Sequence, residues 1–209
     1  MTIERLEPLA RQPHRLKIHL SDGSALATQD YVAADLGLYP GKVLEEADHR
    51  ALLEAVALAA AKNRAVRMIA AAGHSRQDLQ RKLVQKGEDP QAAQAAVDWL
   101  TDLKLLDDRE TAAALVRSAV AKGYGKARIR QILQEKAIPR ELWEEALALV
   151  PAMDEAVDRF LERRFRGEIP DEKEIKRAVD ALLRRGHCYG DIRAGLQRYD
   201  LSLEADFED

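Results

Sequence analysis

The sequence contains a pattern of apolar and basic residues that occurs three times, about fifty positions apart. The matched positions are Leu79, Leu83, Lys86 and Gly87, then Ile129, Leu133, Lys136 and Ala137, and then Ala178, Leu182, Arg185 and Gly186. The same register continues further on, where the pairs Ala96-Val97, Ala146-Leu147 and Gly195-Leu196 align. A repeat of this length predicts similar units that stack on one another, because one unit alone cannot bury its apolar face.

Each repeated unit is predicted to consist of three helices. From about Glu45 onward Ala, Leu, Glu, Lys and Arg predominate, and apolar residues recur at spacings of three and four. We place the helices at 51–72, 75–86 and 90–105, at 108–122, 126–136 and 139–150, and at 152–165, 172–185 and 189–199. Left-handed caps are expected at Gly73, Gly87, Gly123 and Gly186, and first-turn prolines at Pro90 and Pro139. The sequence thus predicts a mainly α protein of three tandem three-helix repeats in an elongated array.

The first 45 residues have a different pattern. Leu16, Ile18 and Leu20 alternate with polar residues before an Asp22-Gly23 turn, which predicts a β-hairpin with a returning strand at 25–27. Residues 3–9 are a candidate third strand, and residues 30–36 a short helix. The predicted segments are therefore 1–45 for this extension, 46–106, 107–150 and 151–209 for the three helical repeats. The last segment ends in an acidic tail at Glu204, Asp206, Glu208 and Asp209.

Composition narrows the class of protein. The 209 residues are 46% hydrophobic, and 33 Lys and Arg against 36 Asp and Glu give a formal charge of −3. A globular protein is expected, and the overall charge favours at most weak direct binding to DNA. A cytoplasmic protein is favoured by the single cysteine, Cys188, and by the lack of a secretory pattern. The apolar stretch at 51–61 is too short to span a membrane.

The residues give no sign of an active site or a cofactor. Asp107 and Asp108 precede an amphipathic run, where an Asp favours helix capping over metal binding. The Gly123-Tyr124-Gly125-Lys126 segment lacks the full phosphate-loop spacing, so a turn between helices is favoured. The histidines are scattered as surface or locally satisfied residues, Cys188 is expected to be a small apolar residue, and the aromatic residues are expected to pack in the core. These histidines and aromatics are His14, His19, His49, His74, His187, Trp99, Tyr124 and Trp143.

Basic residues recur on the second predicted helix of each unit and are the candidate partner contacts. They are Arg76, Arg81 and Lys82, then Lys126, Arg128 and Arg130, and then Arg177 and Arg184. A further cluster comprises Arg159, Arg163, Arg164 and Arg166. Some of these side chains could be only solvated, and Lys86, Lys136 and Arg185 fit cations favoured by the helix dipole. Three cations close to one turn, at 126–130, favour an acidic partner as much as a solvated face.

Three motifs resemble the RecX family. The central one is Leu105-Leu106-Asp107-Asp108 followed by Gly123-Tyr124-Gly125-Lys126-Ala127-Arg128-Ile129 and Lys136-Ala137-Ile138. The first includes Ser75-Arg76-Gln77-Asp78-Leu79, Lys82-Leu83 and Lys86-Gly87, and the third is Leu182-Leu183-Arg184-Arg185-Gly186-His187. The resemblance covers about residues 50–200. Ala137 departs from it, since glycine is typical there, and alanine is expected to continue the helix by one residue.

The resemblance implies a monomeric, non-catalytic regulator whose partners are RecA and the RecA–DNA filament. Such a protein blocks filament growth and strand exchange, and lowers ATP hydrolysis and coprotease activity. Two other readings of the helical repeats remain open. A helix-turn-helix transcription regulator would place a basic helix in the major groove, although base-reading Asn or Gln residues do not recur at the matched positions. The other is an unspecialised helical-repeat adaptor.

Overall fold

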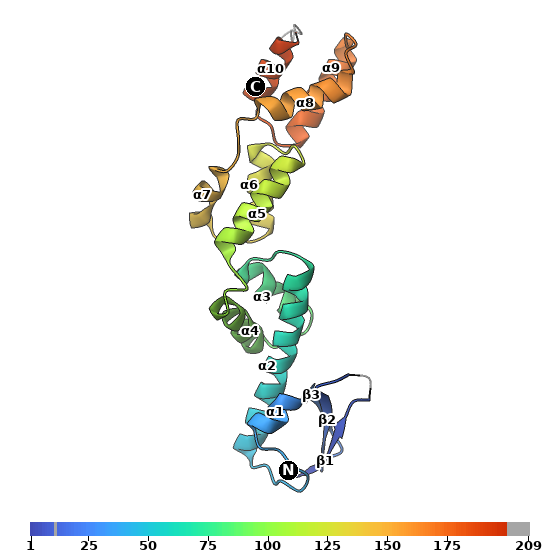
Figure 1. Ribbon diagram of the computed structural model, residues 1–209, viewed down its shortest axis with the longest axis vertical. Helices are drawn as coiled ribbons and strands as arrows, with labels where there is room; N and C mark the ends of the chain where they lie inside the picture. Colours follow the sequence, from blue (N-terminus) through green and yellow to red (C-terminus); the bar gives the residue numbers. More distant parts are fainter. Residues whose placement is uncertain (11, 200–209) are drawn as a thin grey trace. The chain divides into compact units, whose positions relative to one another are not determined.

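The computed structural model describes residues 1–10 and 12–199, with a small sheet at the N-terminus followed by helices (Figure 1). The chain divides into two compact units, Met1–Leu106 and Asp107–Asp209. The mainly α class with an N-terminal β element is therefore confirmed. The predicted division into four segments stays a prediction, and the acidic tail lies outside the described residues.

Three antiparallel strands form the sheet in the order β1-β2-β3. They are β1 (Ile3–Pro8), β2 (Arg15–Leu20) and β3 (Ala25–Gln29), so the third strand is confirmed. The turn after β2 contains Gly23, whose φ of 84° explains why glycine stands there. Alternation along β2 buries Ile18 and Leu20 on one face, together with Ile3 of β1.

Two helices pack with the sheet (Figure 1). Helix α1 (Asp30–Asp35) follows β3, and helix α2 (Glu46–Ala71) begins five residues earlier than predicted. The start of α2 is fixed by a capping box between Glu45 and Asp48, which the apolar periodicity does not reveal. Leu52 of α2 packs in the core under the sheet, whereas Ala61 and Ala65 of the same helix lie in the core of the first repeat.

The first repeat consists of the second half of α2 with α3 (Arg76–Gln85) and α4 (Pro90–Asp102). The Ser75 hydroxyl caps α3 by accepting from the Asp78 amide at 3.1 Å, and Asp89 caps α4 ahead of Pro90. The prediction of a left-handed cap at Gly73 is wrong. Helix α2 ends at Ala71, and the next residue, Ala72, has an extended conformation with a φ of −161°.

The second repeat consists of α5 (Asp108–Ala121), α6 (Lys126–Glu135) and a short final helix. Asp107 caps α5 by accepting from the Arg109 amide at 2.8 Å, which confirms the capping role. The final helix, predicted over 139–150, is a 3-10 turn at Arg140–Leu142 followed by α7 (Trp143–Leu147). Pro139, predicted as a first-turn residue, is instead the N-cap of the 3-10 turn.

The third repeat consists of α8 (Asp154–Phe165), α9 (Glu172–Arg184) and α10 (Tyr189–Arg198). Helix α10 approaches α8 closely at Gly195, where an added Cβ would lie 2.5 Å from Val157 Cγ1. Glycine at this apolar repeat position therefore reflects contact between the two helices. A bidentate ion pair between Arg198 and Asp158, with a shortest distance of 2.7 Å, also joins them.

The repeat register corresponds to real structural equivalence. Leu79, Leu83, Ile129, Leu133, Ala178 and Leu182 are all buried. The turns after α3, α6 and α9 place Gly87, Ala137 and Gly186 at φ of 89°, 50° and 83°. The expectation that Ala137 continues the helix is therefore wrong, because it adopts the left-handed cap that glycine adopts in the other two repeats.

Candidate partner-binding surface

The eight predicted contact residues lie on the second helices of the repeats, α3, α6 and α9. Six of them are exposed: Arg76, Arg81, Lys126, Arg130, Arg177 and Arg184. Lys82 and Arg128 are half-buried. Each of the three helices thus presents cations on its outer face while its apolar stripe faces the core of its own repeat.

In the first repeat, two of these cations neutralise a buried carboxylate. Asp78 is 1% exposed, and its side chain accepts from Arg81 at 2.5 Å, from Lys82 at 2.8 Å and pairs with His74 at 2.8 Å. Burial opposes ionisation of Asp78, but hydrogen bonds from Lys82 and His74 outweigh it, so the pKa of Asp78 lies below its ordinary value. Arg81 and Lys82 therefore help to hold α3 together, which the sequence prediction of contact residues missed.

In the second repeat, one of three cations is paired. Arg128 forms an ion pair with Glu135 on the same helix at 3.1 Å. Within residues 1–10 and 12–199, no carboxylate lies at ion-pair distance from Lys126 or Arg130. The charge of these two exposed side chains is therefore available to a partner.

The turn Gly123-Tyr124-Gly125-Lys126 is hydrogen-bonded to the turn that follows α9. The Gly125 amide donates to the Arg185 carbonyl oxygen at 2.9 Å, and the Ala127 amide donates to the Gly186 carbonyl oxygen at 3.1 Å. These carbonyl groups satisfy free amides at the start of α6, where the N-cap residue, Gly125, has no side chain to do so. The second and third repeats are thus joined through backbone hydrogen bonds.

Side chains reinforce the same junction. His187, which is 4% exposed, pairs through Nε2 with the Gly123 carbonyl oxygen at 3.0 Å, and Arg185 donates to the Lys122 carbonyl oxygen at 3.2 Å. An added Cβ on Gly125 would lie 2.1 Å from the Gly186 oxygen. The predicted turn between helices is confirmed, but sequence reasoning missed that the central and third motifs contact each other.

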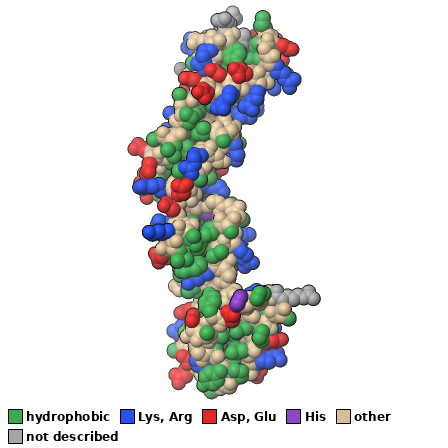
Figure 2. Space-filling view, viewed as in Figure 1, with side chains coloured by type: hydrophobic (Ala, Val, Ile, Leu, Met, Phe, Trp, Pro, Cys, Tyr) green, Lys and Arg blue, Asp and Glu red, His purple; other side chains and the backbone are tan. Residues whose placement is uncertain are grey.

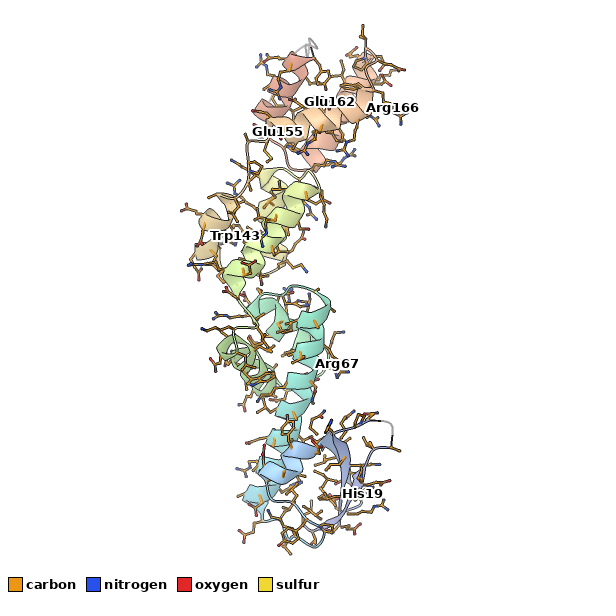
Figure 3. All side chains as sticks on the ribbon, viewed as in Figure 1. His19, Arg67, Trp143, Glu155, Glu162 and Arg166 are labelled. Atoms are coloured by element: carbon orange, nitrogen blue, oxygen red, sulfur yellow. The ribbon has the colours of Figure 1, made fainter. Side chains whose placement is uncertain are left out.

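Other predicted roles are also settled by the geometry. The Trp143 indole, on α7 in Figure 3, donates to the Ile138 carbonyl oxygen at 2.9 Å. Trp143 and Tyr124 pack against the core of the second repeat, and Trp99 packs against the core of the first repeat. Cys188, expected to be a small apolar residue, also has a polar role. It is exposed, and its sulfur caps α10 by accepting from the Asp191 amide at 3.3 Å.

Within the part of the chain that the structure describes, no three His, Cys, Asp or Glu side chains gather closely enough to hold a metal ion. None of the helices described there has the length and apolar character needed to span a membrane.

Comparison with known proteins decides the family. Residues 61–100 match the family model described as RecX, first three-helix domain, and residues 107–147 match RecX, second three-helix domain. Regulatory protein RecX of Xanthomonas axonopodis pv. citri (strain 306) is 40% identical over 140 residues, which cover 66% of this chain and 86% of that protein. The chain belongs to the RecX family. Regulatory protein RecX of Vibrio parahaemolyticus serotype O3:K6 is 32% identical over 145 residues, covering 68% of this chain and 90% of that relative.

Solved RecX structures have the same fold. A crystal structure of regulatory protein RecX superposes with a TM-score of 0.67 at 21% identity, covering 94% of this chain and 98% of that one. RecX from Lactobacillus salivarius gives a TM-score of 0.59 at 21% identity over 69% of this chain and 97% of that one. The resemblance inferred from the three motifs is therefore confirmed, and RecX membership supports a regulatory role.

Proposed function

We propose that this chain binds the RecA filament on DNA and inhibits its recombinase, ATP-hydrolysis and coprotease activities, in DNA repair, recombination and the SOS response. Membership of the RecX family carries the proposal, since the curated relatives are named regulatory proteins. In this proposal the chain acts in the cytoplasm as a monomer, by binding alone.

The contact is assigned to the basic side chains on α3, α6 and α9. They are Arg76, Arg81, Lys82, Lys126, Arg128, Arg130, Arg177 and Arg184. Tandem repeats present equivalent side chains at successive positions, which suits a partner that is itself a repeating filament. Exposure of six of these eight side chains supports the assignment.

The second repeat is expected to contribute more to binding than the first. Lys126 and Arg130 have no carboxylate at ion-pair distance within the described residues, whereas Arg81 and Lys82 already neutralise Asp78. A cation that must break an intramolecular ion pair contributes less binding free energy to a new partner, because the first attraction is lost.

The test is ATP hydrolysis by RecA on single-stranded DNA, measured while this protein is added up to saturation. We expect hydrolysis to fall at concentrations comparable to that of RecA, and this protein alone to hydrolyse no ATP. Unchanged RecA turnover at saturation would refute the proposal. Specific binding to one duplex sequence, without any effect on RecA, would instead support a helix-turn-helix transcription regulator.

A further inference from the structure

A basic groove lies beside the junction of the second and third repeats. It has a volume of about 770 Å³ and lies between the C-terminal end of α5 and one face of α8. Five cationic side chains and one carboxylate line it: Lys122, Arg159, Arg163, Arg164, Arg185 and Glu162. Glu162 lies on α8 in Figure 3, and Figure 2 shows Lys and Arg side chains gathered over the third repeat beside a few acidic ones.

Two of the guanidinium groups are fixed along one face of α8. Arg159 Nε donates to the Glu155 carbonyl oxygen at 3.1 Å, and Arg163 Nε donates to the Arg159 carbonyl oxygen at 3.1 Å. Each bond uses one of the five N–H donors of a guanidinium group, so the other donors can face a ligand. The two residues stand four positions apart, which is about 6 Å along a helix axis.

A third cation is held in place by the fold. Arg185 donates to the Lys122 carbonyl oxygen at 3.2 Å, and its guanidinium carbon lies 5.1 Å from the centre of the Phe160 ring. A side chain ordered before binding loses less conformational entropy when a ligand arrives.

The charges of the five cations are not neutralised by ion pairs within the described residues. In residues 1–10 and 12–199, none of them forms an ion pair with a carboxylate, in contrast to Arg81 and Arg128. Like charges gathered in a concave surface repel one another and concentrate anions from solution. The formal charge of −3 for the whole chain does not remove this local field.

We propose that this groove binds the phosphodiester backbone of a single nucleic acid strand, without reading its base sequence. Arg185 already lies over the ring of Phe160, the one aromatic residue among the described lining, whereas a protein interface is usually built around a free aromatic or other apolar anchor. Cations alone suffice for a phosphate backbone, because neutralising each phosphate releases condensed counterions. Among the described residues, no Asn or Gln lines the groove, and the contacts proposed for its Lys and Arg side chains are with phosphate oxygens, which carry no sequence information.

This site is distinct from the filament contacts proposed on α3, α6 and α9. Binding to a nucleic acid strand can be measured without RecA, so its failure would leave the proposed inhibition of the filament untouched. Failure of the ATP-hydrolysis test would equally leave this groove in place.

The experiment measures anisotropy of a labelled single strand of about twenty thymidines with the full chain, at 50 and 200 mM salt. The variant Arg159→Glu with Arg163→Glu is expected to bind at least tenfold more weakly. Its slope of log affinity against log salt is expected to be shallower by about 1.4, because two phosphate contacts on a single strand are lost.

The matched control is Arg67→Glu with Arg193→Glu, which makes the same change of charge outside the groove. Arg67 also donates through Nε to a carbonyl oxygen four residues earlier, at 3.2 Å from Asn63. We expect this control to bind within twofold of the original chain, and both variants to melt as it does. The variant Arg159→Gln with Arg163→Gln removes the two charges without reversing them, so it perturbs the fold less. It should also weaken binding.

Three results would overturn the proposal: unchanged affinity in the folded groove variants, equal loss in the control, or a polyglutamate of the same length binding as tightly as the oligonucleotide. The last result would assign the groove to an acidic protein segment.

Discussion

The Gly125 amide donates a hydrogen bond to the Arg185 carbonyl oxygen at 2.9 Å, so two of the three sequence motifs meet through their backbones. This contact explains why the central motif carries glycine at a position where φ is −79°, a value open to any residue. The requirement is for space, since the Gly186 peptide lies where a side chain would begin.

The variant Gly125→Ala should therefore destabilise the unit formed by residues 107–209. Its Cβ would lie 2.1 Å from the Gly186 oxygen, and relief requires the two turns to separate. We expect a loss of about 1–3 kcal/mol or more, measured by urea unfolding. Gly190→Ala is the control, because its Cβ would meet only Cys188 Sγ at 3.8 Å and alanine favours a helix. Equal stability of the two variants would contradict the packing argument.

Replacing Ala137 by glycine should stabilise the protein. Ala137 adopts a φ of 50°, which costs a residue with a Cβ about 1 kcal/mol relative to glycine. The unfolding free energy should rise by somewhat less than this, since glycine also gains entropy in the unfolded chain. The reciprocal variant Gly87→Ala, at a φ of 89°, should lower it. A destabilised Ala137→Gly protein would show that this turn is held by something other than backbone conformation.

Asp78 should make the stability of the first repeat depend on acid pH. Because its folded pKa lies below the ordinary value of 3.8, its contribution is complete above that value and is lost as pH falls through the lowered pKa. Asp78→Asn should cost about 2–4 kcal/mol near neutral pH, since Lys82 and Arg81 lose their buried anion.

The measurement is the difference in unfolding free energy between the original chain and Asp78→Asn from pH 7 to pH 3. We expect this difference to be constant above about pH 5 and to shrink below pH 4. Taking the difference removes the titration of other carboxylates. A gap that widens in acid would mean that Asp78 is protonated in the folded protein.

Charge reversal on α6 tests the proposed filament contact. Arg128→Glu with Arg130→Glu should weaken binding to RecA filaments at least tenfold, because attraction is replaced by repulsion. If these cations were only solvated, the variant would bind normally and its stability would change by a few tenths of a kcal/mol. Arg5→Glu with Arg50→Glu is the control, since both of these arginines are exposed and far from α3, α6 and α9 in sequence.

Salt dependence separates two kinds of partner at α6. A protein surface gives a shallow loss of affinity with salt, whereas phosphates give a steep linear one in logarithmic terms. We expect the shallow dependence for filament binding through Arg128 and Arg130. A slope that falls by about one for each arginine removed would assign them to DNA.

Helices were predictable because the apolar period is local. Leu79, Ile129 and Leu182 lie on buried stripes that a spacing of three and four residues reveals directly. The cap at Asp107 was predictable for the same reason, since its side chain bonds to amides two and three residues away, whereas Ser75, placed inside the predicted helix at 75–86, is the N-cap of α3. The left-handed Ala137 was signalled only by its alignment with Gly87 and Gly186.

The contacts between repeats could not be predicted, because they join residues far apart in sequence. Nothing local in the Arg185-Gly186-His187 turn indicates that its carbonyl groups accept from Gly125 and Ala127. The ion pair between Asp78 and Lys82 had a usable signal, since a spacing of four residues brings side chains together on a helix, whereas His74 lies before the start of α3. The basic groove combines Lys122 with arginines of α8, and only the fold brings them together.

Helix α2 takes part in two hydrophobic cores, through Leu52 under the sheet and through Ala61 and Ala65 in the first repeat. The family model begins at residue 61, within this helix, and the N-terminal extension is joined to the repeat by continuous helix with no flexible linker. If the sheet unfolded, the first half of α2 would lose its packing and Leu52 would be exposed to water. The extension and the first repeat should therefore unfold in one cooperative transition. Truncation of the chain to the residues that match the family model would therefore lower the stability of the remaining repeat.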